Sequence, residues 1–195
     1  MKRYLAVAVL LLFQVSLISG CIFDSDRERP RPSPPQPPAW PDLKEKDDVF
    51  EYLSKVYNNR NYDRYPKLLD DNFIFKFGVD DVGGEIPEQW GRTEELQSAQ
   101  GMFMGRSVPP YGAVDRIDLT LNPEGEWLAI PQTDPPFDGE TWYRKTVEYR
   151  LIVQTTGGWT LQGLNKKALF DIRYAKSQGD TATVWRIVRW SDDIK

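Results

Sequence analysis

The chain of 195 residues contains no histidine and only one cysteine. The absence of histidine removes the commonest general base and the commonest transition-metal ligand. A single cysteine cannot form an intramolecular disulfide. Aromatic residues, by contrast, make up 13% of the chain, with 7 Trp, and hydrophobic residues make up 40%. This composition predicts one globular domain with accessory segments and an aromatic-rich interior.

The N-terminus has the layout of a secretory signal peptide. Lys2 and Arg3 precede an apolar stretch over residues 5–18, and two small residues then lead to Cys21. The apolar stretch is short for a membrane-spanning helix, which favours a cleaved targeting segment over residues 1–20. The alternative is an uncleaved N-terminal helix with an incidental thiol.

The run Ile18-Ser19-Gly20-Cys21 resembles the lipobox of bacterial lipoproteins. The resemblance implies cleavage before Cys21 and a diacylglycerol on its sulfur, so the membrane is the expected partner through that lipid. Ile22 follows where Asp would signal inner-membrane retention, which favours the outer membrane if the cell has one. Loss of Lys2 and Arg3 changes the formal charge from -4 to -6, and such an acidic protein is a poor nucleic-acid binder.

Residues 21–41 are expected to form a lipidated, proline-rich tether. Seven prolines fall between residues 30 and 41. Such a run favours extended polyproline II over helix or sheet, so it would space the domain from the membrane. A proline-rich docking peptide is the alternative interpretation.

The pattern changes to that of an α+β domain over residues 42–195. Apolar residues at helical spacing predict a helix ending near Tyr57 and capped by Asp42, a short helix over residues 62–69, and a third helix capped by Thr93. Alternating residues predict strands, listed here by range: 73–77, 116–121, 147–154, 159–174 and 183–192. The last strand is apolar on both faces, which predicts a central position in its sheet.

Three connections complete the prediction. Residues 70–72 are predicted to form a turn, and residues 78–92 are predicted to form a glycine-rich loop. Residues 122–141 are predicted to form a long connection with four prolines. The long connection could act as a lid or as a passive hairpin insertion. The alternation of residues along the strand predicted over 159–174 changes phase near residues 163–168, which predicts a β-bulge.

The stretch from Tyr57 to Phe77, with its polar turn, short helix, acidic turn and aromatic strand, resembles the opening of the nuclear transport factor 2-like, or SnoaL-like, superfamily. The ending over residues 184–190 is similar to that family's closing strand. The resemblance covers about residues 42–193. It implies three N-terminal helices packed on a curved antiparallel sheet, a cone that encloses a pocket, and often a dimer.

The same resemblance weakens the case for an enzyme. Steroid isomerases of the superfamily use an acidic base and a Tyr donor, and these positions fall on Phe77 and Leu53, which are apolar. Dehydratase and cyclase members commonly rely on His, which is absent. No catalytic residue, cofactor or metal is therefore predicted. A loop with Asp80, Asp81 and Glu85 could hold Ca²⁺, but its spacing fits a solvated acidic loop better.

The candidate pocket combines residues from the predicted helices and strands. Arg92 could hold an anion at a helix start, although packing on an aromatic ring is the default for such a residue. Tryptophans could line an apolar pocket or fill the core. The predicted pocket residues are Tyr57, Phe77, Trp90, Arg92, Trp185 and Trp190.

Three functions remain open at this stage. The favoured one is a membrane-tethered, non-catalytic module that binds a small apolar ligand or a protein. The second is a lyase or isomerase that acts on a small apolar substrate with an Asp/Tyr acid–base pair. The third is a structural envelope component that works through homodimer contacts.

Overall fold

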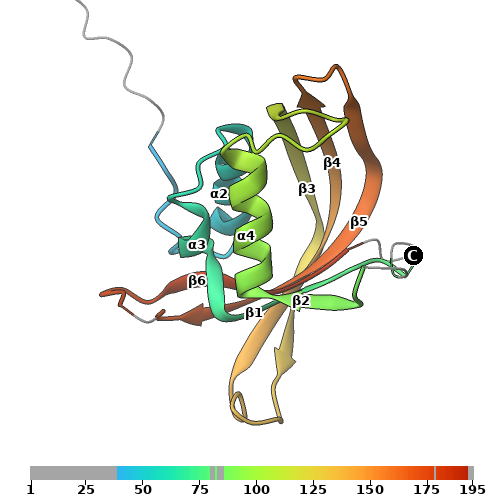
Figure 1. Ribbon diagram of the computed structural model, residues 1–195. Helices are drawn as coiled ribbons and strands as arrows, with labels where there is room; N and C mark the ends of the chain where they lie inside the picture. The colour runs from blue at the N-terminus through green and yellow to red at the C-terminus, as the bar shows by residue number, and fades with distance from the viewer. Residues whose placement is uncertain (1–38, 80–81, 83–85, 178, 193–195) are drawn as a thin grey trace, which may run out of the picture. The chain divides into compact units, whose positions relative to one another are not determined.

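The computed structural model describes residues 39–79, 82, 86–177 and 179–192 (Figure 1). The chain divides into two units after Ala39, and the second unit is Trp40–Lys195. The predicted signal peptide, Cys21 and the proline-rich run up to residue 38 lie outside the described residues, as do Asp80, Asp81 and Glu85. All that follows concerns the second unit.

The described elements comprise three helices and six strands. In chain order they are α2 (Asp48–Asn58), α3 (Tyr65–Leu68), β1 (Leu69–Lys76), β2 (Gln89–Gly91), α4 (Arg92–Phe103), β3 (Val114–Pro131), β4 (Thr141–Thr155), β5 (Thr160–Ala175) and β6 (Val184–Ser191).

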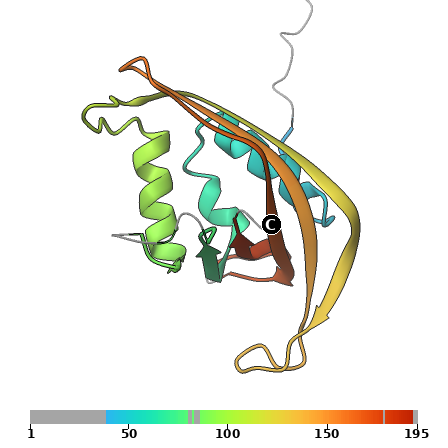
Figure 2. The ribbon, with the colours of Figure 1, turned by 90° about the vertical axis from the view of Figure 1, so that its right-hand side faces the viewer.

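The strands form one six-stranded sheet in the order β2-β1-β6-β5-β4-β3. The sheet curves, and the helices lie on its concave side (Figure 2). The predicted α+β, cone-like class is confirmed. The pairing differs from the prediction in one respect, because β1 runs parallel to β6 and the sheet is therefore mixed. The predicted central position of the last strand is correct, since β6 lies between β1 and β5.

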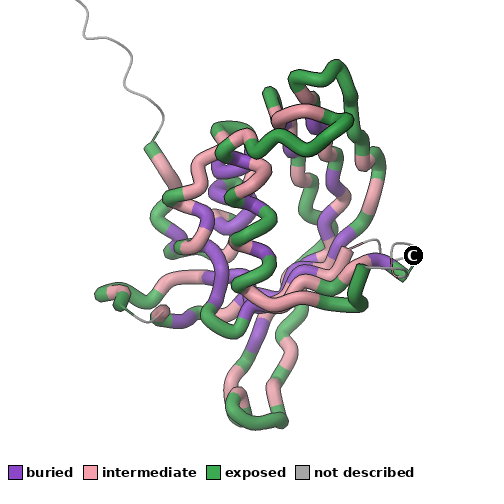
Figure 3. The backbone as a smooth tube through the Cα atoms, in the orientation of Figure 1, coloured by how far each residue is buried: buried purple, intermediate pink, exposed green. Residues whose placement is uncertain are grey.

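The start of the first helix differs from the prediction. Asp42 is not its cap, because Leu43 adopts a positive φ of 58° that a continuing helix does not allow. The buried Leu43 instead accepts a hydrogen bond at its carbonyl from the Trp185 amide, 2.9 Å away. The helix begins at Asp48, after Asp47, and its apolar face is buried as the periodicity predicted (Figure 3).

Two further boundaries were predicted wrongly. The short helix ends at Leu68, and the supposed turn over residues 70–72 belongs to β1. Asp70 tolerates a strand because Arg173 binds its carboxylate, with Nε 2.8 Å from Oδ2. The third helix starts after Gly91 rather than Thr93, and the Glu94 side chain accepts from the Gly91 amide at 3.1 Å.

The predicted connection over residues 122–141 is mostly strand. The edge strand β3 continues to Pro131, and a register shift between Glu124 and Leu128 interrupts its pairing with β4. Pro123 is compatible with this position because an edge strand can leave one side of its backbone unpaired. The lid interpretation is therefore wrong for most of the segment. The bulge predicted in β5 is confirmed at Asn165, which has a φ of 53°.

Buried ion pairs lie on the sheet face opposite to the Phe170 ring. Asp171 is 1% exposed, and Arg144 binds it through two hydrogen bonds of 2.7 and 2.9 Å. Arg189 approaches the same carboxylate at 3.4 Å. Asp171 therefore compensates two guanidinium groups that are themselves about two-thirds buried.

Candidate functional site

Aromatic rings fill the space between the helices and the centre of the sheet. Tyr57 packs edge-on against Phe103, with centroids 5.0 Å apart, and lies 6.4 Å from Trp190. Trp190 in turn contacts Phe170 and Phe75 at 4.8 and 5.4 Å. Two of the predicted pocket residues, Tyr57 and Trp190, are thus brought together, and both are buried.

A chain of polar groups runs through this aromatic interior. Tyr65 donates a hydrogen bond to Oε1 of Glu95, and the Trp90 indole donates to Oε2 over 3.1 Å. The hydroxyls of Tyr57 and Tyr65 are 3.4 Å apart. Glu95 is only 5% exposed, and both of its oxygens have a donor. This chain ties α4 to α3, α2 and β2.

Burial controls the protonation of these groups. Loss of solvent raises the pKa of the Glu95 carboxyl, although hydrogen bonds from Tyr65 and Trp90 oppose the shift. Burial also raises the pKa of Tyr57 and of Tyr65, and the nearby Glu95 charge adds to both shifts. The two tyrosines therefore remain neutral phenols, which can donate protons but cannot serve as bases near neutral pH.

A second polar pair joins β4 to the end of β6. The Tyr149 hydroxyl donates to Oδ1 of Asp192 over 2.5 Å. The backbone amide of Asp192 binds the Lys76 carbonyl at 2.8 Å, which fixes the carboxylate beside β1. Sequence reasoning identified neither this pair nor Glu95.

An apolar groove of about 380 Å³ lies beside α4. Its helical wall includes Ser98, Gly101 and Met102, and its sheet wall includes Val153 and Leu161. The connection between α4 and β3 closes one side with the residues Arg106, Val108, Tyr111, Gly112 and Val114. A cavity of this size and character suits a small ligand with a mainly apolar surface.

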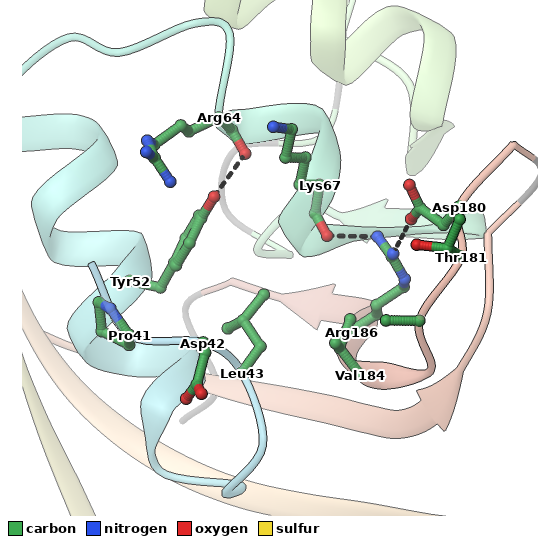
Figure 4. A pocket seen from close by; sticks show the side chains of 11 residues that line it. Pro41, Asp42, Leu43, Tyr52, Arg64, Lys67, Asp180, Thr181, Val184 and Arg186 are labelled. Carbon is green, nitrogen blue, oxygen red and sulfur yellow. Dashed lines mark hydrogen bonds and ion pairs between the residues drawn. The ribbon is translucent and has the colours of Figure 1, made fainter. Parts of the chain in front are cut away.

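A more polar hollow of about 240 Å³ lies where the chain enters α2 (Figure 4). Arg186, which is 2% exposed, donates to the Lys67 carbonyl and to Asp180. The Tyr52 hydroxyl lies across the hollow and contacts the Arg64 carbonyl at 3.4 Å. Arg186 uses both terminal nitrogens to hold α3 against the β5–β6 connection, which is a structural arrangement.

None of the six predicted pocket residues lines the apolar groove, and four of them lie outside the buried aromatic cluster of Tyr57 and Trp190 as well. The Phe77 ring packs against Trp90 at 4.7 Å, and Arg92 donates to the Pro66 carbonyl over 3.0 Å. Trp185 donates to the Lys44 carbonyl over 3.0 Å and packs on Tyr143. Arg92 thus binds a backbone oxygen in this structure, rather than the aromatic ring that was the default expectation.

Three further observations concern the described residues. Leu53, which the sequence resemblance aligns with the Tyr donor of isomerases, is fully buried. No three His, Cys, Asp or Glu residues cluster as metal ligands within the described part of the chain. No helix among those same residues is long and apolar enough to cross a membrane.

Comparison with solved structures identifies the same architecture in other proteins. A proposed aromatic ring hydroxylase from Novosphingobium aromaticivorans superposes with a TM-score of 0.51 at 9% identity, over 75% of this chain and 84% of the other. An NTF2-like protein of unknown function in nutrient uptake, from Rhodospirillum rubrum, superposes with a TM-score of 0.47 at 10% identity, over 78% of this chain and 99% of the other.

A proposed scytalone dehydratase from Novosphingobium aromaticivorans superposes with a TM-score of 0.44 at 11% identity, over 75% of this chain and 78% of the other. No protein-family model matches the sequence, and no curated protein matches it either. The domain thus shares its α+β fold with the proposed aromatic ring hydroxylase. At these identities the likeness concerns the fold alone, and function must be argued from the site.

Proposed function

We propose that the domain binds a small apolar ligand in the groove between α4 and strands β3 to β5, without catalysing a reaction on it. The groove itself carries the proposal, because Met102, Val153 and Leu161 give it apolar walls. Gln97, Ser98, Arg106 and Thr155 also line the groove, but its surface is mainly apolar, so burial of apolar surface would supply most of the affinity. The ligand would then be held by shape and apolar contact.

Gly101 offers a sharp test of this proposal. A Cβ added there meets nothing closer than the Arg106 side chain at 3.9 Å, so the backbone accepts a side chain. Gly101→Phe should fill the groove and weaken binding of fatty acids or aromatic compounds about tenfold or more. The measurement is a fluorescence titration with a panel of such ligands.

The matched control is Gly101→Ala, which leaves the groove open. This substitution should keep ligand affinity and raise stability by up to about 1 kcal/mol, because alanine favours the helix. Equal affinities for Gly101→Phe and the wild type would place the ligand elsewhere. Binding of no compound in the panel would instead favour a protein partner for the module.

The proposal includes attachment to the cell envelope through a lipid on Cys21. A solvated proline-rich tether that begins at residue 21 would let the domain reach ligands near the membrane, although it ends before residue 41 because Trp40 packs on Tyr52 at 5.3 Å. Its support is the sequence pattern around Cys21, which lies outside the described residues.

Substitution Cys21→Ala should block lipoprotein processing, because the thioether needs the sulfur. The expected result is an accumulated precursor that keeps residues 1–20, detected by mass spectrometry of the membrane fraction. Ser19→Ala is the control, since it preserves a small residue and should be processed normally. Mature-sized, membrane-bound Cys21→Ala protein would contradict the lipoprotein interpretation.

A second candidate function is acid–base catalysis on a small apolar substrate. The observation in its favour is the Tyr149–Asp192 pair, whose oxygens are 2.5 Å apart. A lyase or isomerase could use the carboxylate as base and a phenol as donor. Turnover that Asp192→Asn abolishes and Gly101→Ala preserves would establish this activity over simple binding.

A further inference from the structure

The end of α4 places an arginine beside the apolar groove. Gly105 adopts a positive φ of 70°, which turns the chain where the helix ends. The amide of the next residue, Arg106, then donates to the Gly101 carbonyl over 2.8 Å, as in a Schellman motif. The chain therefore folds back, and Arg106 joins the residues of α4 that line the groove.

The missing side chain of Gly101 leaves room for the stem of Arg106. A Cβ at position 101 would lie 3.9 Å from both Cδ and Nε of Arg106, which is ordinary van der Waals contact. The stem thus lies along the helical wall of the groove. Because Arg106 lines the groove and is also exposed, its guanidinium lies where the groove opens to solvent.

Among the described residues that line the groove, Arg106 alone is charged. The neutral polar groups there include the Thr155 hydroxyl, which already accepts a hydrogen bond from the Trp159 amide over 3.3 Å. Arg106 forms no ion pair and no side-chain hydrogen bond with any residue that the structure describes. Its guanidinium is therefore available to a ligand.

The acids of this region do not compensate Arg106. Asp115 follows the lining residue Val114, but Asp115 is exposed and does not itself line the groove. Glu94 and Glu95 lie in the first turn of α4, at the opposite end of the helix. Across the described part of the chain, none of these three acids pairs with Arg106. The groove thus combines apolar walls with a single positive charge at its opening.

We propose that the ligand of the groove is an amphiphile with a carboxylate head, such as a fatty acid, and that Arg106 binds the carboxylate. This inference rests on the proposed function, because it assigns the class of ligand for the same groove. The planar fork of a guanidinium matches the two oxygens of a carboxylate. The alkyl tail packs against Met102, Val153 and Leu161. The head stays at the solvent edge, so its charge is not buried without water.

An arginine just after a helix also interacts favourably with the negative end of the helix dipole. That role would stabilise α4 whether or not a ligand is bound. It would alter the unfolding of the protein, but it would not alter the choice between a charged and a neutral head. The decisive comparison is therefore between two ligands that share one tail.

The test titrates the full chain, held in phosphatidylcholine nanodiscs, with decanoate and with decanol. Empty nanodiscs give the partitioning of each compound into lipid, which is subtracted, and calorimetry gives each Kd. We expect Arg106→Gln to weaken decanoate binding about tenfold and to change decanol binding by less than about twofold. Arg106→Lys should recover part of the loss, because it keeps the charge but not the fork.

Arg150→Gln is the matched control, because it removes the same charge from an exposed residue of β4 that does not line the groove. It should leave both affinities unchanged, and thermal unfolding verifies that all variants fold. Equal effects of Arg106→Gln on decanoate and decanol would overturn the carboxylate inference and leave the proposed function standing. Binding of neither compound by the wild type would contradict the proposed function and this inference together.

Discussion

Replacing Asp171 with alanine should lower the free energy of unfolding by about 3–5 kcal/mol. Asp171 is 1% exposed and binds Arg144 through two hydrogen bonds, with Arg189 at 3.4 Å. Removal of the carboxylate leaves two partly buried guanidinium groups without compensation. Such a loss costs more than the pair itself contributes, because the remaining charges stay desolvated. Urea denaturation measures the difference.

The control for this prediction is Asp118→Ala. Asp118 also binds an arginine, Arg116, at 3.0 Å, but both side chains are largely exposed. Water and salt screen that pair, so its loss should cost only about 0–1 kcal/mol. Similar destabilisation by the two substitutions would show that burial of the Asp171 cluster has no special energetic role.

The second large effect concerns pH and Glu95. Because burial raises the pKa of this carboxyl above its ordinary value of 4.5, the folded protein binds the proton more tightly than the unfolded chain. The stabilising contribution of the protonated form is fully present below the ordinary pKa. It is lost as the pH rises through the higher pKa of the folded state.

A comparison with Glu95→Gln isolates this contribution. The amide keeps an acceptor for Trp90 and a donor for Tyr65, but it does not titrate. The wild type should lose stability relative to Glu95→Gln as the pH rises from 4.5 toward neutrality. Trp90→Phe removes a hydrogen bond that lowers the pKa, so it should move the loss to higher pH. Parallel stability curves for wild type and Glu95→Gln would contradict the prediction.

The sequence predicted the features that depend on hydrophobic pattern. The helix around Leu53 and the central strand around Ile187 each show a periodicity that burial confirms. The boundaries at Asp42 and Asp70 were wrong because long-range contacts, to β6 and to Arg173, overrode local preference. No local signal distinguishes such contacts from ordinary caps and turns.

The polar interior was harder to predict for a related reason. Glu95 occurs in the first turn of a helix, where acidic residues usually face solvent and favour the helix dipole. Its burial depends on Tyr65 and Trp90, which come from elements with no shared sequence pattern. The groove likewise depends on the path of the connection after α4, because residues of that connection line it, and the sequence does not specify this path.

The place of β6 has a consequence for how the molecule is assembled during synthesis. Among the described strands β6 comes last in the chain, yet it lies between β1, more than a hundred residues earlier, and β5. Until it is available, the β1–β2 pair and the β3–β4–β5 meander remain separate pieces with open edges. Closure of the sheet therefore waits for residues 184–191, and topologies with such distant pairings fold slowly.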